Sequence, residues 1–288
     1  MKFLDIFTFP NEDMETDFTW SIRRTCYDTF YPFQILSKHR LERIDFEEIT
    51  ILYGGNGSGK STALNIIANK IGADRDTLYN KSNFYSDYLN LCQAKFYKKN
   101  FNDCRIITSD DVFDYMLNIR NMNEEIDAQR ESIMDEFDYI KNHPEAYQFK
   151  SLDDYDKLKK INQVRRSNKS QFARKSLVNN LREQSNGESA FMYFTEKIKE
   201  NGIYILDEPE NSLSPEKQLE LLKFIEDSAR FFNCQFIIST HSPFLLSLKE
   251  AKIYDLDECP VDIKKWYELQ NVKIYQKFFE EHRKEFES

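Results

Sequence analysis

The sequence predicts an α/β fold with a mostly parallel β-sheet, on the strength of two observations. Short apolar runs alternate with longer amphipathic segments on both sides of a polar stretch, which is the pattern of strands joined by crossover helices. Glycine is rare, with seven in 288 residues, and four of the seven lie within six positions after the first clear apolar run. A chain this poor in glycine places it where the backbone turns tightly or approaches a ligand.

The elements follow in chain order. Strands are predicted by short apolar runs at 49–53, 105–108, 203–207, 235–240 and 252–256. Helices are predicted at 60–71 and 215–232, in a short turn after Pro243, and in an amphipathic segment over about 270–285. The stretch from about 114 to 182 is polar and charged and breaks near 142–144, which indicates a helical insert of two arms. We therefore expect a core formed by 1–112 and 185–288, and an insert formed by 113–184.

Composition excludes several classes of protein. The net charge of −9 argues against a general nucleic-acid binder. No run of about 18 apolar residues occurs, and the first residues turn acidic too soon for a signal peptide, so we expect a cytoplasmic protein with no membrane segment. The five cysteines form no C-x-x-C pair, and with only four histidines no metal-binding spacing emerges. We expect each cysteine to be a reduced, buried, small apolar residue.

The glycine cluster matches G-x-x-x-x-G-K-[ST] between a predicted strand and a predicted helix. Its residues are Gly54, Gly55, Asn56, Gly57, Ser58, Gly59, Lys60, Ser61 and Thr62. Backbone N–H groups of such a loop converge on phosphate, and the helix N-terminus adds its dipole. Lys60 is expected at the β- and γ-phosphates of ATP, Ser61 on Mg²⁺, and Thr62 near the α-phosphate. The alternative is a structural glycine turn that happens to precede a lysine.

Two consecutive carboxylates stand at the end of the predicted strand 203–207, after four apolar residues. This strand delivers Asp207 and Glu208 to the carboxyl edge of the sheet, where open α/β sheets bind ligands. Asp207 suits a direct or water-mediated contact to Mg²⁺, and Glu208 can orient or deprotonate an attacking water. The alternative is a strand that ends in a solvated acidic turn.

Further motifs around these two point to a known family. Ser185-Asn186-Gly187-Glu188 precedes the acidic strand, Glu210-Asn211-Ser212-Leu213-Ser214-Pro215 follows it, and a later strand ends in Ser-Thr-His241-Ser-Pro. This order resembles the Walker A, signature, Walker B, D-loop and H-loop set of ABC-type ATPases. The S-x-G-E signature resembles the SMC-like and repair branch, and small stand-alone bacterial ATPases within it, more than transporters, whose signature usually reads LSGGQ. The resemblance covers 45–72 and 183–256 well and the insert only in outline.

The resemblance carries expectations for fold, site and partners. It implies a P-loop NTPase core with a mostly parallel sheet, an antiparallel N-terminal β portion and a helical insert. It implies that Ser185, Gly187 and Glu188 bind the γ-phosphate held by the phosphate loop of a second copy, in a head-to-tail homodimer. It also implies that His241 hydrogen-bonds the γ-phosphate, so that Glu208, His241 and Lys60 form the catalytic set. A lone histidine of structural importance is the alternative for His241.

One family feature has no clear match. ABC ATPases carry a glutamine after a strand ahead of the insert, where it contacts Mg²⁺ and water. Gln93 is near this place but lies in a region that reads as helical, so Asp110, after strand 105–108, is our substitute as a Mg²⁺ ligand. A helix N-cap is the alternative role for Asp110. For adenine stacking the candidates are Tyr27, Phe30, Tyr31 and Phe33, although we expect these aromatic residues to pack in the core.

The two arms of the insert carry opposite charge. Nine basic residues and no acidic one lie between Lys157 and Arg182, whereas eight acids lie between Asp114 and Asp138. We expect the arms to neutralise each other, and the alternative is a surface for nucleic acid or an acidic partner. The sequence thus predicts an ATP-hydrolysing enzyme that dimerises on ATP and acts on an effector protein or nucleic acid, in repair, defence against phage or stress. The ATPase subunit of a membrane transporter and a non-catalytic ATP switch are the alternatives.

Overall fold

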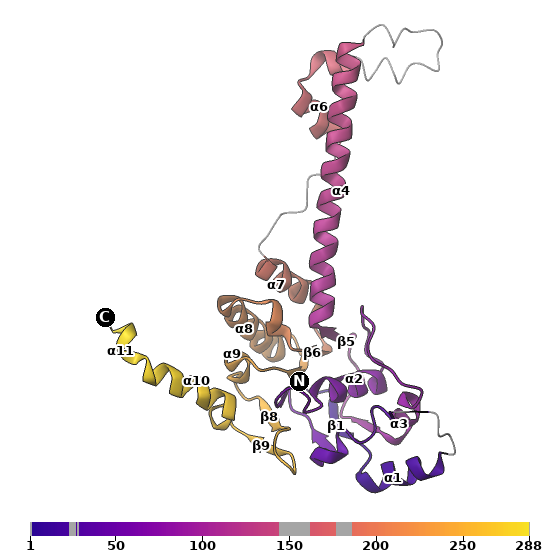
Figure 1. Cartoon of the computed structure of the whole chain (residues 1–288), viewed down its shortest axis with the longest axis vertical. Coiled ribbons are helices and arrows are strands. Elements are labelled where there is room, and N and C mark those ends of the chain that lie inside the picture. The colour runs from indigo at the N-terminus through magenta and orange to yellow at the C-terminus, as the bar shows by residue number, and fades with distance from the viewer. Residues whose placement is uncertain (1, 23–26, 28, 144–161, 177–185, 288) are drawn as a thin grey trace. The chain divides into compact units, whose positions relative to one another are not determined.

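The computed structural model describes residues 2–22, 27, 29–143, 162–176 and 186–287 (Figure 1). The chain divides into two compact units. The core unit comprises Met1–Phe113 and Asn186–Ser288, and the insert unit comprises Asp114–Ser185. Over the described residues no helix is both long enough and apolar enough to cross a membrane.

The main sheet of the core unit has six strands in the order β5-β6-β7-β3-β8-β9. The bounds are β3 Ile49–Tyr53, β5 Asp103–Thr108, β6 Gly202–Asp207, β7 Gln235–Ser239, β8 Lys252–Asp255 and β9 Asp262–Lys264. Neighbouring strands from β5 to β8 pair in parallel, and only the edge strand β9 is antiparallel to its neighbour. The predicted α/β fold with a mostly parallel sheet is confirmed.

A second, smaller sheet is antiparallel and has the order β2-β1-β4. Its strands are β1 Leu4–Thr8, β2 Arg43–Asp45 and β4 Gln93–Phe96. The fully buried side chain of Gln235, on β7, joins this sheet to the main one: its Oε1 accepts from the N–H groups of Phe3 and Leu4, and its Nε2 donates to the Leu4 carbonyl. The antiparallel N-terminal portion that the resemblance implied is therefore present.

Helices flank the strands of the core unit (Figure 1). Their bounds are α1 Glu12–Ser21, α2 Lys60–Ile71, α3 Tyr85–Leu91, α7 Asn186–Lys197, α8 Pro215–Phe231, α9 Pro243–Leu246, α10 Gln270–Glu281 and α11 Arg283–Phe286. Short 3-10 turns lie at η1 Ser37–His39, η4 Pro209–Ser212 and η5 Trp266–Glu268. The α8 helix begins where Ser214 caps it and Pro215 takes the first turn, because proline has no N–H to leave unpaired there.

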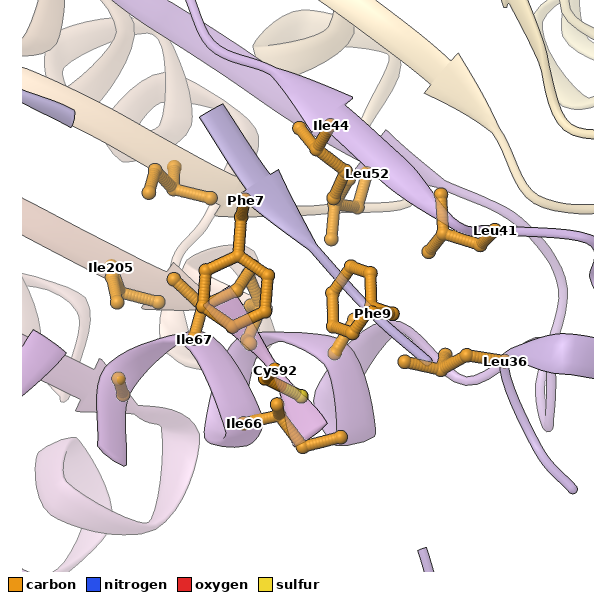
Figure 2. Packing of buried hydrophobic residues seen from close by; sticks show 14 of the residues in the cluster. Phe7, Phe9, Leu36, Leu41, Ile44, Leu52, Ile66, Ile67, Cys92 and Ile205 are labelled. Carbon is orange, nitrogen blue, oxygen red and sulfur yellow. The ribbon is translucent and has the colours of Figure 1, made fainter. Parts of the chain in front are cut away.

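The main hydrophobic core lies between helix α2 and strands of the two sheets, β1 among them (Figure 2). Phe7 and Phe9, from β1 and the residue after it, face Ile66 and Ile67 of α2, and all four are buried. Burial of such side chains stabilises the fold by roughly 1.5–3 kcal/mol each. Because α2 begins at the glycine loop, this packing also fixes the position of the loop.

Two local expectations are wrong. The region of Gln93 was expected to be helical, but α3 ends at Leu91 and Gln93 begins β4, which pairs with β1. Cys259 is exposed, because it lies in the turn between β8 and β9, whereas Cys92, Cys104 and Cys234 are buried as expected.

The insert unit contains most of α4 (Ser109–Asn142) and α6 (Lys169–Ser176). Its small apolar cluster is formed by Phe137, Ile140, Val164 and Phe172. Lys169 forms an ion pair with Asp138, so at this point the basic and acidic arms do neutralise each other. Lys157, Lys159, Lys160 and Arg182 lie outside the described residues, as does much of the basic stretch.

Candidate nucleotide site

The loop between β3 and α2 has the backbone shape that a phosphate site requires. Gly57 and Gly59 adopt φ values of 84° and 90°, a region that side chains with a Cβ disfavour. At Gly59 an added Cβ would also lie 2.9 Å from Cδ2 of Leu36. No side chain caps the N-terminus of α2, so its first N–H groups are free to bind an anion. Within the described residues the buried hydroxyl of Ser58 has no hydrogen-bond partner, a second feature that a phosphate oxygen would satisfy.

Lys60 is buried at the start of α2 and turns back over the loop. Its Nζ donates to the carbonyls of Gly54 (2.8 Å) and Gly55 (3.1 Å) and lies 4.0 Å from Oε1 of Glu208. Burial lowers the pKa of Lys60, and the nearby carboxylate of Glu208 acts in the opposite direction. The ammonium is therefore held beside the loop by partners that a phosphate could replace.

Ser61 and Asp207 meet at the carboxyl edge of the sheet. The Ser61 hydroxyl donates to Oδ1 of Asp207 at 3.1 Å, and the Ser239 hydroxyl donates to the same oxygen. Asp207 and Ser239 are paired in the β6–β7 register, which explains their contact. Burial raises the pKa of Asp207, while the hydrogen bonds from Ser239 and Ser61 lower it.

This pair fits a Mg²⁺ ion by the chemistry of its donors, since a hydroxyl and a carboxylate are hard oxygen ligands. No group of three or more His, Cys, Asp or Glu side chains forms a metal cluster in the described part of the chain. The other ligands of a cation here would then be nucleotide oxygens and water, as is usual for Mg²⁺.

Glu208 leaves the strand in the left-handed region, with φ 49°. Its N–H donates to the backbone oxygen and to the hydroxyl of Ser239, both at 3.1 Å. Its Oε2 accepts from the side chain of Asn211 at 3.0 Å. A non-glycine residue in this conformation costs roughly 1–3 kcal/mol and is typical of functional positions. The bend turns Glu208 away from the strand pattern, towards Lys60 and His241.

His241 follows β7 and completes the group. Its Nε2 is buried, lies 3.4 Å from Oε1 of Glu208 and has no hydrogen-bond partner in the described part of the chain. The structure thus brings together the side chains of Lys60, Ser61, Asp207, Glu208 and His241, which come from three separate segments. An ammonium, a hydroxyl, two carboxylates and an imidazole at one sheet edge can bind a triphosphate with its cation and activate water.

Asp110 is not brought into this group by any observed contact. Asp110 is exposed in the first turn of α4. The alternative prediction, that Asp110 is the N-cap of this helix, is wrong, because the helix already begins at Ser109. The cap is formed instead by Thr108 and Asp111: the carboxylate of Asp111 accepts from the Thr108 N–H, and the Thr108 hydroxyl accepts from the Asp111 N–H. In the β5–β6 register Thr108 lies opposite Asp207, so Thr108 occupies the strand end beside the carboxylate.

The aromatic candidates for adenine stacking pack in the core, as expected. Phe33 is buried and stacks on Phe18, and Tyr27 and Phe30 contact Phe84. Tyr31 is half-buried, and its hydroxyl lies 3.5 Å from that of Thr62, at the start of α2.

The signature segment opens α7. Gly187 and Glu188 lie in the first turn of that helix, and Ser185 lies outside the described residues. A Cβ on Gly187 would lie 3.8 Å from the backbone nitrogen of Ser214, so this turn packs beside the start of α8. Outside its own helix, the described atoms within 4 Å of that Cβ belong to Lys217 and Ser214, and none belongs to the phosphate loop of the same chain.

Two contacts of the site were not predicted. Asp257, just after β8, accepts the N–H of Gly55 on both carboxylate oxygens, at 2.8 and 2.9 Å. Glu210 accepts the N–H groups of His241 and Ser242 through Oε1. Each acid follows the carboxyl end of a predicted parallel strand. Because the carboxyl ends of parallel strands lie at one edge of the sheet, where ligands bind, both acids could have been predicted to lie near the site.

Comparison with known families decides the class of protein. The profile of a family described as ABC transporter matches residues 42–211, more than half of the chain, and one described as AAA ATPase domain matches 186–246. The chain belongs to the ABC family. It is an ATP-binding ATPase domain of that family, and the resemblance to ABC-type ATPases that its motifs carry is confirmed by the matches. A search of curated proteins found no match.

Solved structures of ABC-family ATPases are similar to the chain at low identity. The SMC head domain of Pyrococcus furiosus, with an extended coiled coil and bound to the C-terminal domain of ScpA, is 14% identical; 84% of this chain and 95% of that one are covered, with a TM-score of 0.38. The SMC head domain of Thermotoga maritima is 14% identical, with 77% and 92% covered and a TM-score of 0.36. An ATP-binding cassette dimer bound to ADP and Pi is 12% identical, with 78% and 88% covered and a TM-score of 0.37.

Proposed function

We propose that this ABC-family protein hydrolyses Mg²⁺-ATP in a head-to-tail homodimer and uses the cycle to act on an effector protein or a nucleic acid. The observation that supports this best is the convergence of Lys60, Ser61, Asp207, Glu208 and His241 at one sheet edge.

In the proposed reaction Lys60 and the loop N–H groups bind the β- and γ-phosphates. Ser61 and Asp207 would hold Mg²⁺, which neutralises charge on the phosphate oxygens when it is bound. Glu208 takes a proton from the attacking water. The water oxygen forms a bond to the γ-phosphorus, and the bond between the γ-phosphorus and the ADP oxygen breaks. His241, whose Nε2 lies 3.4 Å from Oε1 of Glu208, donates a hydrogen bond to the γ-phosphate.

The proposed dimer is supported by the separation of the signature segment from the phosphate loop within one chain. Among the described residues, no phosphate-loop atom of the same chain lies within 4 Å of a Cβ built on Gly187. Gly187 and Glu188 lie in the first turn of α7. We propose that they, with Ser185, cover the γ-phosphate bound by a second copy. ATP would then be buried between two subunits, and its hydrolysis would release them.

Sizing the Glu208→Gln protein tests this directly, because it should bind ATP without consuming it. We expect light scattering to report a monomer without nucleotide and a dimer with Mg²⁺-ATP. Gly187→Asp, placed at the covering surface, should abolish the dimer while ATP still binds. A Glu208→Gln protein that stays monomeric with saturating Mg²⁺-ATP rules out the dimer.

Duplex DNA in the same experiment separates the partner classes. If the basic arm of the insert binds nucleic acid, DNA should shift the size of the complex and raise the rate of the wild-type ATPase, and both effects should weaken with added salt. Arg165→Glu with Arg166→Glu is the matched variant, because both side chains belong to the described part of that arm. An unchanged size and rate with DNA would favour a protein effector.

A further inference from the structure

The backbone of His241 is bound from two directions, by a residue of the motif that follows the acidic strand and by a residue of α10. Oε1 of Glu210 accepts the His241 N–H at 2.6 Å and the Ser242 N–H at 3.2 Å. On the other side, Nδ2 of Asn271 donates to the His241 carbonyl at 2.9 Å. The peptide groups on both sides of this histidine are therefore fixed by side chains from η4 and α10.

Both of these side chains are themselves anchored beside the site. Glu210 lies two residues after Glu208 in the same short turn. The N–H of Asn271 donates to the hydroxyl of Tyr53 at 3.1 Å, and Tyr53 is the buried last residue of β3, directly before the phosphate loop. The backbone of His241 is thus connected to the acidic turn on one side and to the base of the phosphate loop on the other.

In the described part of the chain no hydrogen bond orients the imidazole of His241. Its Nε2 is buried and faces Oε1 of Glu208 at 3.4 Å, without a hydrogen bond. Where no partner fixes the ring itself, its position depends on the backbone that carries it.

A carboxylate at position 210 is costly for stability. Burial raises the pKa of Glu210, its Oε2 has no hydrogen-bond partner in the described part of the chain, and the two N–H groups satisfy only Oε1. Charge-assisted hydrogen bonds are about twice as strong as neutral ones, so a carboxylate holds these N–H groups more firmly than an amide could. A costly group retained beside a reactive site indicates a role in that site.

We propose that Glu210 and Asn271 are positioning residues that hold His241 in place for ATP hydrolysis. This inference rests on the proposed function, because it assigns the two residues to the same reaction. Neither touches the nucleotide; both act through the backbone of His241.

The first test is Asn271→Ala, with Gln270→Ala as its matched control, since Gln270 is the exposed neighbour in the same turn of α10. We expect Asn271→Ala to lower kcat roughly 3- to 10-fold, the range for loss of one orienting hydrogen bond, with KM for ATP nearly unchanged. Gln270→Ala should match the wild type. A fall in thermal stability with an unchanged kcat would show a merely structural role.

A double-mutant cycle with His241→Ala identifies the route of the effect. If Asn271 acts through His241, adding Asn271→Ala to His241→Ala should cause no further loss of kcat. The same holds for Glu210→Gln, which keeps the size and an acceptor oxygen but not the charge, with Glu200→Gln at the opposite edge of the sheet as control. Losses that multiply in the double variants would overturn the inference.

An NMR measurement separates failure of this inference from failure of the proposed function. The imidazole signals of His241, assigned by their loss in His241→Ala, should shift in Asn271→Ala and in Glu210→Gln but not in Gln270→Ala. If the wild type has no ATPase activity, the proposed function fails, yet these shifts still show whether the two residues position the ring. Signals that stay at wild-type positions in both variants reject the inference without any assay of turnover.

Discussion

The two halves of the nucleotide site are built in different ways. The phosphate half, residues 54–62, is a contiguous segment whose shape comes from its own backbone, with Gly57 and Gly59 at positive φ. The hydrolytic half, residues 207–211 and 239–242, is assembled from two strand ends. Its members are joined by side chains: Ser239 contacts Asp207 and the Glu208 N–H, and Glu210 binds the His241 N–H.

The two halves also rely on different support. Behind the phosphate half lies the segment 34–37, in which Leu36 approaches Gly59 and Ser37 donates to the buried carboxylate of Glu15. The hydrolytic half is held by hydrogen bonds across the β6–β7 edge and from α10. We infer that changes in the first half act through backbone strain and lost phosphate contacts, and that changes in the second act on turnover with nucleotide still bound.

The largest effect should come from Glu208→Gln, in the hydrolytic half. Loss of a general base is expected to lower kcat by about 10²- to 10⁴-fold while the Kd for Mg²⁺-ATP changes little. Phosphate release measured beside calorimetric binding checks both quantities. A variant that still turns over at the wild-type rate would remove Glu208 from the reaction, and a wild type with no turnover at all would favour the non-catalytic switch.

Lys60→Met, in the phosphate half, should weaken the binding of ATP, whereas Glu208→Gln mainly lowers kcat. Methionine keeps the apolar stem but removes the ammonium, so the affinity for ATP should fall by about 10- to 100-fold, as for the loss of a charged hydrogen bond. Isothermal titration with a non-hydrolysable ATP analogue measures this. Lys70→Met, at the other end of α2, is the control and should bind like the wild type. Tight binding by Lys60→Met would contradict the assigned role.

Glycine substitutions test whether the phosphate half depends on its backbone. Gly57→Ala should cost about 1–2 kcal/mol of folding free energy, because alanine disfavours positive φ. Gly59→Ala has the same strain and in addition a contact of 2.9 Å to Leu36, so its cost should be larger. Urea unfolding of the two variants side by side gives the comparison. Equal losses would mean that the segment at Leu36 yields freely and does not support the loop.

The smallest effect concerns Glu15, whose carboxylate accepts a hydrogen bond from Ser37 in the segment 34–37. Burial raises the pKa of Glu15 above its usual 4.5. At pH values between the pKa in the unfolded chain and the pKa in the folded chain, the folded chain keeps a proton that the unfolded chain has lost. The free energy of unfolding therefore falls as the pH rises from the lower to the higher of these two pKa values. Glu15→Gln cannot ionise, and its free energy of unfolding relative to the wild type should increase from about pH 4 to pH 7. Unfolding by urea across this range, with exposed Asp17→Asn of the same helix as control, measures the difference, and a constant offset would contradict the prediction.

Much of the fold could be predicted from the sequence because its signals are local. The apolar runs at 49–53 and 203–207 form β3 and β6, and the helix predicted at 60–71 is α2. The small strands β1, β2 and β4 were missed, since each is short and gains its partners from distant segments. Gln93 illustrates this: only its pairing with β1 makes it part of a strand.

What the sequence alone determined is the phosphate loop, because nine neighbouring residues carry both its glycine-dependent backbone and its lysine. It also determined that Asp207, Glu208 and His241 lie at or just after the ends of buried strands. Only the tertiary structure decided how these groups meet. The strand register sets Thr108 and Ser239 beside Asp207, and the packing of α10 brings Asn271 to His241. Contacts between residues 30 or more positions apart depend on register and packing, which no local pattern of residues specifies.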